Sequence, residues 1–410
     1  MDEKIILGID LSDAGTVLAV YGEEGCTKVP TVICRIRNTG EWYVGEKAYE
    51  KVLDGTGIIT DKLLSLTSRD GFATLDGNRF SGKELLTQFL KRVIEQAFEC
   101  LNYDYPSDIV VSLPEVDKHT VQKVYDCLLK LGYRVGHVHV ISRSESFIYY
   151  VMSQSSDIYS THVGLFSMEN ACLTYYEMKV QRKGRNVTVY ADREVLDESF
   201  NLYILSSQAG ARLGDKILTS CAERLLRNKV FSAVILTGKG FETQEWAPSF
   251  MKFVCQRRKV FVDDEVFARG AGFRGYDFAA EKPVFSFICI CDGRLESSVY
   301  IDISQEDRVV PYPIASIGDP WHDIERSIRL IPNGINTLEL SVIPMEARQR
   351  RKVRIPLDFL PQRPNRTTMI SLKVSFNDSR TMLVDIRDLG FGELYPATDA
   401  HLSREVRLWE

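Results

Sequence analysis

The sequence predicts an α/β domain with a duplicated core, followed by an all-β sandwich. Strand-like and helix-like segments alternate over residues 1–282, and each half of that stretch, 1–155 and 156–282, opens with a β-hairpin. From residue 283 helical periodicity fades, and short alternating segments are separated by Asn-Gly, Asp-Gly and Asp-Pro signals. Such regular short strands are typical of a β-sandwich, here over 283–410.

The first half contains the clearest local signals. Strands are predicted at 5–10, 17–21, 31–35, 41–44 and 108–113. Ser81 and Glu84 have the spacing of a capping box, in which the serine caps free backbone N–H groups at a helix start. An apolar stripe at helical spacing follows: Leu85, Leu86, Phe89, Leu90, Val93, Ile94, Ala97 and Phe98. A second helix is predicted over 120–131, with Gly132 ending it at positive φ.

The second half repeats the pattern of the first. Strands are predicted within 161–180 and at 186–191 and 233–237, and helices at 213–227 and 246–255. The sandwich strands are predicted at 299–303, 337–343, 352–357, 369–376 and 382–386. The two halves of the α/β region therefore indicate a structural duplication, although they share no visible sequence identity.

Composition limits the classes of partner. The formal net charge of -5 gives no global reason to expect nucleic-acid binding. No apolar stretch approaches the roughly 18–20 residues that span a bilayer, so no membrane partner is expected. The start of the sequence does not resemble a signal peptide, and nine scattered cysteines fit a reducing compartment. We therefore expect a cytoplasmic protein.

Residues 7–19, LGIDLSDAGTVLA, resemble the first phosphate loop of the actin-fold ATPases. Such a loop needs small residues because backbone N–H groups must approach phosphate oxygens closely. The resemblance implies that Asp10 holds a magnesium ion through water. It also implies nucleotide contacts from Gly8, Ser12, Gly15 and Thr16. This sequence departs from the family at Ser12, which replaces a glycine, and at Asp13 and Ala14, which replace paired threonines.

Further segments in the same order resemble the DnaK-type heat-shock chaperones within that superfamily. The segment 59–66, ITDKLLSL, is similar to the one that carries the family's phosphate-contacting lysine, here Lys62. The strand and loop AVILTGKGF at 233–241 resemble the adenosine motif, which implies nucleotide contacts from Gly238 and Gly240. Other matches are WYVGEKA at 42–48, DIVVSLP at 108–114, the helix start containing Glu145 within 141–150, and DEVFARGAG at 264–272.

The second phosphate loop departs most from the chaperones, which carry Asp-Leu-Gly-Gly-Gly-Thr-Phe-Asp there. The corresponding residues 165–172 read LFSMENAC, so every glycine and the leading aspartate are missing. A non-glycine residue in the left-handed region costs about 1–2 kcal/mol, which predicts a changed loop shape. Glu169 would repel a phosphate by roughly 4 kcal/mol at about 4 Å. Only about sixty residues separate this loop from Ala233, so the family's adenine-clamping subdomain is expected to be reduced.

The sandwich region carries a separate resemblance. Residues 355–376, IPLDFLPQRPNRTTMISLKVSF, are similar to the chaperone substrate-binding sandwich, which implies that a protein or peptide segment binds there. The family's acidic-leucine linker is not recognisable, and no C-terminal helical lid is expected after the sandwich.

These features lead to three hypotheses about function. The leading one is a catalytically degenerate, DnaK-like interaction protein in which ATP or ADP with magnesium binds weakly or not at all; Asp10 and Lys62 are the remaining catalytic candidates. The alternative is an active, divergent ATP-hydrolysing chaperone in which Asp13, Glu169 or Asp215 replaces the missing aspartate. The third is an actin-like assembly scaffold. Oligomeric state is left open.

Some residues suggest chemistry but have structural explanations. The pairs Cys289 with Cys291 and His137 with His139 lack additional metal ligands at suitable spacing. The basic run at 348–354 is more typical of a solvated strand face than of an anion site. Asp385 and Asp388 do not have the spacing of an EF-hand loop and indicate a turn.

Overall fold

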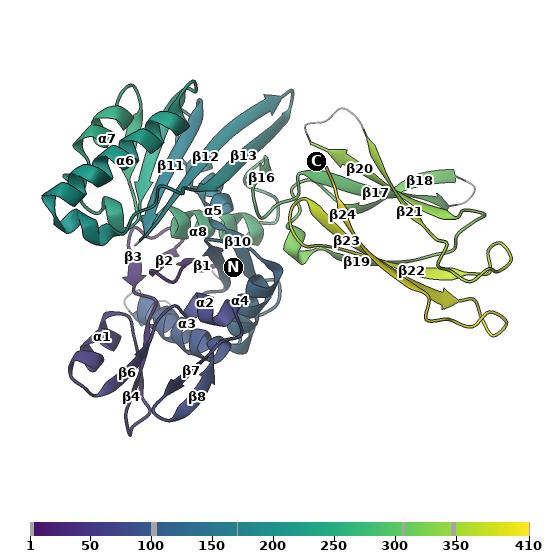
Figure 1. Cartoon of the computed structure of the whole chain (residues 1–410), viewed down its shortest axis with the longest axis horizontal. Coiled ribbons are helices and arrows are strands. Elements are labelled where there is room, and N and C mark those ends of the chain that lie inside the picture. The colour runs from purple at the N-terminus through teal and green to yellow at the C-terminus, as the bar shows by residue number, and fades with distance from the viewer. Residues whose placement is uncertain (1–3, 100–104, 170, 306–307, 346–349, 410) are drawn as a thin grey trace. The chain divides into compact units, whose positions relative to one another are not determined.

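The computed structural model describes residues 4–99, 105–169, 171–305, 308–345 and 350–409. The chain divides into two compact units, Met1–Phe287 and Ile288–Glu410. The first unit combines helices with several sheets, and the second is rich in strands (Figure 1). No helix among the described residues combines the length and the apolar composition that crossing a bilayer requires.

The first sheet of unit 1 has the order β10-β9-β1-β2-β3. Its strands are β1 (Ile6–Leu11), β2 (Thr16–Val20), β3 (Cys26–Val29), β9 (Asp108–Leu113) and β10 (Val138–Ser142). β1, β9 and β10 are parallel, whereas β2 is antiparallel to both β1 and β3. β1 and β9 are buried on both faces, as expected for strands covered by helices on each side.

The second sheet repeats this topology. Within unit 1 its order is β15-β14-β11-β12-β13. The strands are β11 (His162–Glu169), β12 (Cys172–Lys183), β13 (Asn186–Val195), β14 (Phe231–Thr237) and β15 (Lys259–Val262). β11, β14 and β15 are parallel, and β12 is antiparallel to both β11 and β13. The duplication predicted from the paired hairpins is therefore visible as one strand order used twice.

Helices cover both sheets. They are α1 (Glu46–Leu53), α2 (Leu63–Ser68), α3 (Gly82–Glu99), α4 (Lys118–Lys130), α5 (Arg143–Met152), α6 (Gln208–Leu226), α7 (Pro248–Val254) and α8 (Val266–Ala279). The predicted capping box at α3 is confirmed, because the Ser81 N–H donates to Glu84 at 2.8 Å and the Glu84 N–H donates to Ser81 at 3.3 Å. Gly132 has φ 97°, as expected at the end of α4.

Small strands between β3 and α3 escaped the sequence analysis. β4 (Ile33–Ile36) and β5 (Trp42–Val44) were predicted, but β6 (Gly57–Thr60), β7 (Phe72–Leu75) and β8 (Asn78–Ser81) were not. These segments have four residues each and little alternation of polarity, so each is too short for the two-residue period of a strand to be detected. They form a three-stranded sheet β5-β4-β6 and the hairpin β7-β8.

Helix α8 lies close to β1 and α5 through glycines. A Cβ at Gly8 would lie 2.1 Å from the Ala268 carbonyl oxygen, and one at Gly270 would lie 1.9 Å from the Ser146 carbonyl oxygen. Real Cβ atoms do not approach so closely, so both positions require glycine for packing. The motif DEVFARGAG therefore has a structural reason independent of any ligand.

Unit 2 contains two four-stranded antiparallel sheets, with the orders β18-β17-β20-β21 and β19-β22-β23-β24 (Figure 1). The strands are β17 (Ser297–Gln305), β18 (Arg308–Ala315), β19 (Glu325–Leu330), β20 (Thr337–Pro344), β21 (Arg351–Pro356), β22 (Met369–Phe376), β23 (Thr381–Gly390) and β24 (His401–Arg407), preceded by β16 (Ile288–Ile290). Alternate residues of β22 and β23 are buried. The sequence analysis missed β18, β19 and β24, whose mostly exposed residues weaken the alternation.

The polar groups flagged in this unit have protein partners. Asp388 accepts hydrogen bonds from Arg363 at 2.9 Å to each of its oxygens and from the Gly390 N–H at 2.9 Å. Of the basic run, residues 348 and 349 lie outside the described residues. Arg350 is 3.2 Å from Asp302, and Lys352 and Arg354 are 2.7 and 2.8 Å from Glu339. No cluster of three or more potential metal ligands occurs among the described residues.

Candidate functional site

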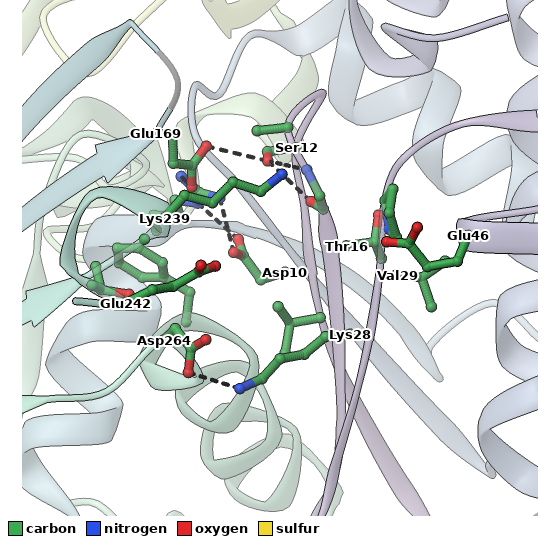
Figure 2. A pocket seen from close by; sticks show the side chains of 18 residues that line it. Asp10, Ser12, Thr16, Lys28, Val29, Glu46, Glu169, Lys239, Glu242 and Asp264 are labelled. Atoms are coloured by element: carbon green, nitrogen blue, oxygen red, sulfur yellow. Dashed lines mark hydrogen bonds and ion pairs between the residues drawn. The ribbon is translucent and has the colours of Figure 1, made fainter. Parts of the chain in front are cut away.

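A cleft of about 250 Å³ lies between the two sheets of unit 1 (Figure 2). Both halves contribute to its walls. Its lining residues are Asp10, Ser12, Ala14, Gly15, Thr16, Val17, Lys28, Val29, Pro30, Glu46, Arg143, Glu169, Thr237, Gly238, Lys239, Glu242, Asp264 and Phe267. The structure thus brings together most of the residues that the sequence singled out in the loops after β1 and β14.

A buried arginine, Arg143, lines the cleft beside two carboxylates. Asp10 lies near the end of β1, and Arg143 is the first residue of α5, whose start is fixed by Ser142 accepting a hydrogen bond from the Glu145 N–H at 3.1 Å. Arg143 donates from Nε and Nη2 to the two Asp10 oxygens, each at 2.8 Å, and its Nη1 lies 2.8 Å from Oε1 of Glu169. Asp10 and Glu169 come from different halves, so one guanidinium connects both.

The turn between β1 and β2 is closed on itself. The Ser12 hydroxyl donates to the Gly15 carbonyl at 3.0 Å, and the Gly15 N–H donates back to that hydroxyl at 3.3 Å. Ser12 also contacts Glu169 at 3.3 Å, and Thr16 shares a 2.8 Å hydrogen bond with Thr31. Gly15 therefore already uses the N–H that a phosphate loop would offer to an anion.

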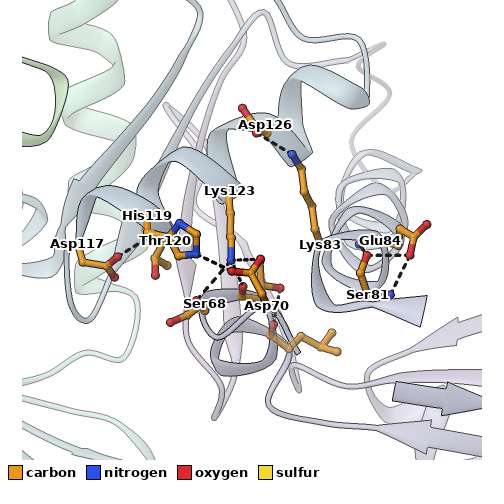
Figure 3. A network of polar contacts seen from close by, with 12 residues as sticks. Ser68, Asp70, Ser81, Lys83, Glu84, Asp117, His119, Thr120, Lys123 and Asp126 are labelled. Carbon is orange, nitrogen blue, oxygen red and sulfur yellow. Dashed lines mark hydrogen bonds and ion pairs between the residues drawn. The ribbon is translucent and has the colours of Figure 1, made fainter. Parts of the chain in front are cut away.

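Asp13 and helix α2 form a separate polar arrangement. Asp13 accepts hydrogen bonds from the N–H groups of Leu64 at 2.9 Å and Ser65 at 3.1 Å, and also from the Ser65 hydroxyl. At the other end of α2, Lys123 donates to the Thr67 carbonyl at 2.8 Å and lies 2.6 Å from Asp70 (Figure 3). Both ends of α2 are therefore held by side chains from elsewhere, and Asp13 serves as its cap.

Two further predicted residues lie away from the cleft wall. Lys62 precedes α2 with φ 52° and is not among the residues that line the cleft. Gly8 packs against α8 and is likewise not among the residues that line the cleft.

Asp215 accepts hydrogen bonds from the N–H groups of Ser249 at 3.1 Å and Phe250 at 2.9 Å, at the start of α7. This carboxylate is thus used in holding α7 against α6.

The glycines after β14 pack against Met168. Gly238 has φ 89°, and a Cβ there would lie 2.5 Å from the Met168 carbonyl oxygen. A Cβ at Gly240 would lie 2.3 Å from the Met168 sulfur. Gly238 lines the cleft and Gly240 does not. Both glycines are thus required by packing on β11, whether or not a ligand binds.

The second loop has a simpler shape than the sequence analysis expected. Residues 167–169 belong to β11, and Glu169 is paired with Cys172 of β12. Ser167, Met168 and Glu169 all have negative φ, so the expected left-handed strain is absent at these three residues. Asn170 lies outside the described residues. The strand simply continues to Glu169 and places its carboxylate in the cleft.

Comparison with family models identifies both units. Residues 15–292 match the C-terminal model of a family of unknown function, DUF5716, and this match spans more than half of the chain. The chain belongs to the DUF5716 family. Residues 294–408 match the model of a domain of unknown function, DUF8552. Comparison with the curated proteins gave no match.

Carboxylates outnumber cations in the DUF5716 cleft. The acidic lining residues are Asp10, Glu46, Glu169, Glu242 and Asp264, and the basic ones are Lys28, Arg143 and Lys239. Arg143 is taken up by Asp10 and Glu169, and Lys28 lies 2.8 Å from Asp264. A polyphosphate entering this cleft would meet lining residues with a net negative charge, and two of the three cations, Arg143 and Lys28, are already paired.

The ionisation of the buried pair follows from its surroundings. Burial raises the pKa of Asp10 to about 6, against the opposing attraction of Arg143. Burial lowers the pKa of Arg143, but the Asp10 and Glu169 carboxylates outweigh it and the net direction is upward. The pair is therefore ionised at neutral pH, and Asp10 is the member that takes up a proton in acid.

Sequence reasoning missed Arg143, the residue around which the DUF5716 cleft is organised. Its signal was present: a long cation directly follows a buried strand and precedes the apolar residues Phe147, Ile148 and Val151 of α5. A charge at such a position is costly unless it is paired. Glu145, noted in the same segment, instead pairs with Arg274 of α8 at 3.0 Å.

Proposed function

We propose that this DUF5716 protein is a DnaK-like interaction module whose ATPase site is degenerate. The observation that carries the proposal is the buried Asp10–Arg143–Glu169 network inside the cleft. The guanidinium lies against the carboxylate that would hold a hydrated magnesium ion, and its charge repels a cation there. Mg-ATP and Mg-ADP are therefore poor ligands for these residues, and the site does not support ATP hydrolysis.

The strand order supports an actin-like, ribonuclease H-like architecture for unit 1. Each sheet has three antiparallel strands followed by two parallel ones, and the cleft lies where the β1–β2 turn faces the β11–β12 hairpin. The resemblance in residues 7–19 and 264–272 implies the same arrangement. In this proposal, protein contacts do what a nucleotide does in relatives of this architecture: they connect the halves.

Among the described residues, three polar contacts between side chains that line the cleft contribute to that connection. Arg143 reaches Glu169 at 2.8 Å, Ser12 reaches Glu169 at 3.3 Å, and Lys28 reaches Asp264 at 2.8 Å. Each contact joins an element of the first half to one of the second. The halves are thus held together without a ligand, which favours a constitutive interaction module over a nucleotide-driven cycle.

The divergent-ATPase alternative lacks a free carboxylate among its named candidates. Asp13 caps α2, Asp215 caps α7, and Glu169 is paired with Arg143. Any of them would have to leave these partners before it could position a metal ion or an attacking water. The alternative therefore requires that at least one of these carboxylates leaves its described partners.

The partner, in this proposal, is a protein or peptide segment bound by the sandwich. Strand registers place residues 331–336, 361–368 and 391–400 at one end of unit 2. Apolar side chains are exposed there, most of all Leu394 at 88%, together with Ile331, Ile335, Leu389 and Phe391. Exposed apolar side chains on loops that connect the strands of a rigid sheet are typical of protein-binding surfaces.

Steady-state ATP turnover tests this function. We expect phosphate release at the background rate for the wild type and for Asp10→Asn alike. Turnover at ordinary chaperone rates that Asp10→Asn abolishes would reject the degenerate-site proposal. Sedimentation with and without Mg-ATP separates the scaffold hypothesis, which requires assembly, from a module that keeps one sedimentation coefficient in both conditions.

A further inference from the structure

A basic β-hairpin extends from the second sheet of unit 1, away from the cleft. It is formed by residues 178–191 of β12 and β13, MKVQRKGRNVTVYA, and is here named the basic hairpin. It contains Lys179, Arg182, Lys183 and Arg185 and no acidic residue. The whole chain has 51 Lys and Arg against 56 Asp and Glu, so this local charge is opposite in sign to the total.

The hairpin has a defined tip. Lys183 pairs with Asn186, which leaves a two-residue loop of Gly184 and Arg185. Gly184 has φ 62° whereas Arg185 does not have a positive φ. Glycine at the first loop position is the pattern of a type II′ turn, whose twist matches that of the flanking strands. The turn therefore holds Arg185 at the apex, and residues 182–186 are exposed.

Cations occur on both faces of this ribbon. Successive side chains of a strand point to opposite faces, so Lys179 and Lys183 share one face while Arg182 lies on the other. Lys179 lies 4.9 Å from the ring centroid of Tyr190. In the part of the chain that the structure describes, no carboxylate pairs with Arg182, Lys183 or Arg185. Their charges are thus available to an external anion.

We propose that the basic hairpin binds duplex nucleic acid by entering a groove. The major groove of B-DNA admits a two-stranded β-ribbon, and its two walls are lined by phosphates. Cations on both faces and at the apex match two phosphate walls, whereas an acidic protein surface or a membrane would meet only one face or the tip. Gln181 and Asn186 add amide groups that can hydrogen-bond along the ribbon.

Total charge hides this feature. The expectation of no nucleic-acid partner came from the net charge of -5, which averages the hairpin with the rest of the chain. Because the remaining surface is acidic overall, it repels phosphates and confines the contact to the hairpin. We therefore expect weak binding with a strong dependence on salt concentration.

Fluorescence anisotropy of a labelled duplex of roughly 20 base pairs, with the full chain in about 25–150 mM KCl, measures the binding. Neutralising about four phosphates predicts a slope near -3.6 for log K against log salt. The triple variant Arg182→Ala, Lys183→Ala, Arg185→Ala should bind at least about tenfold more weakly at roughly 50 mM salt, with a slope near -1.

The matched control removes the same net charge elsewhere. Arg350, Lys352 and Arg354 are paired with Asp302 and Glu339, so replacing these three cations by Ala should change the Kd by less than about twofold. Equal losses in both triple variants would overturn the proposal by assigning the effect to net charge. Failure of the wild type to bind the duplex at the lowest salt would also overturn it.

Competition identifies the class of partner. Polyglutamate and vesicles containing phosphatidylglycerol serve as the acidic-protein and anionic-lipid probes. Binding of either probe without binding of the duplex would contradict the groove geometry and assign the hairpin to that class. Unchanged circular dichroism and Tm of the hairpin variant show that any loss of binding is local, because residues 182–186 contribute nothing to the buried core.

Discussion

Arg143 donates to both oxygens of Asp10, from Nε to Oδ1 and from Nη2 to Oδ2, each at 2.8 Å. Its remaining nitrogen, Nη1, reaches Glu169 at 2.8 Å. A single guanidinium thus neutralises carboxylates from both halves of the α/β unit inside a cleft. We expect stability, its pH dependence and the binding of Mg-ATP to depend on this arrangement.

Removing the Arg143 guanidinium should lower the free energy of unfolding substantially. Arg143→Met leaves the Asp10 carboxylate buried without its partner, so we expect the free energy of unfolding to fall by about 3–5 kcal/mol in urea titrations. The control is Arg224→Ala, an exposed residue that pairs with Glu194 and Glu198, for which we expect a loss below about 1 kcal/mol. Adding Asp10→Asn to Arg143→Met should recover part of the loss. Equal, small losses in both single variants would show that the buried network does not matter.

The same network predicts a pH dependence of definite sign. The pKa of Asp10 is about 6 in the folded protein, whereas an unfolded aspartate has a pKa of about 4. Between about pH 4 and pH 6 the folded state therefore binds more protons than the unfolded chain, and this group's contribution to stability falls as pH rises. Asp10→Asn lacks the titrating group.

The measurable quantity is the difference in free energy of unfolding between the wild type and Asp10→Asn. The free energy of unfolding of the wild type, relative to that of Asp10→Asn, should fall by up to about 3 kcal/mol as pH rises from about 4 to about 7. Using the difference cancels the carboxylates with lowered pKa elsewhere, such as Asp388 and Asp126, which act in the opposite direction. A difference that stays constant with pH would contradict the assignment.

Substitutions at the two glycines after β14 test which part of Met168 each glycine packs against. Gly240→Ala meets the Met168 side chain, so we expect a loss of about 1–3 kcal/mol that Met168→Ala partly restores. Gly238→Ala meets the Met168 backbone at φ 89°, and Met168→Ala should not restore it. Thermal unfolding of the two double variants checks this contrast. Rescue of both glycine variants alike would contradict the packing geometry.

Asp13 offers a test of the capping role against the catalytic one. Asp13→Ala removes the acceptor for the Leu64 and Ser65 N–H groups, so we expect a loss of about 1–2 kcal/mol in stability. Asp13→Ser, which keeps a capping oxygen, should lose less. Chemical denaturation measures both. An Asp13→Ala variant as stable as the wild type would free this carboxylate for the alternative function.

Local sequence signals predicted much of the secondary structure for identifiable reasons. The capping box at Ser81 and Glu84 and the apolar stripe behind it predicted α3, and the run DIVVSL at 108–113, with four apolar residues, predicted β9 with its bounds. Those signals are contained within a few neighbouring residues. The four-residue strands near β6 and the exposed strand β19 carry too little periodicity to be detected.

The candidate site was only partly predictable because its contacts join distant segments. The loops near Asp10 and Gly238, which the sequence singled out, both line one cleft. The pairing of Asp10 with Arg143 spans 133 residues and depends on β1 and β10 lying on either side of β9. Likewise, Asp13 and Asp215 accept hydrogen bonds from backbone N–H groups of α2 and α7 that lie 51 and 35 residues further along the chain.

Calorimetric titration of Mg-ATP into the wild-type protein tests the central claim most directly. If Arg143 already satisfies Asp10 and Glu169, the titration should show no binding heat and Mg-ATP at about 1 mM should leave Tm unchanged. Saturable one-to-one binding with a Kd near about 1 μM, lost in Asp10→Asn, would contradict the account. That outcome would mean that the Arg143 side chain moves away from Asp10 and Glu169 when a metal-bound nucleotide binds.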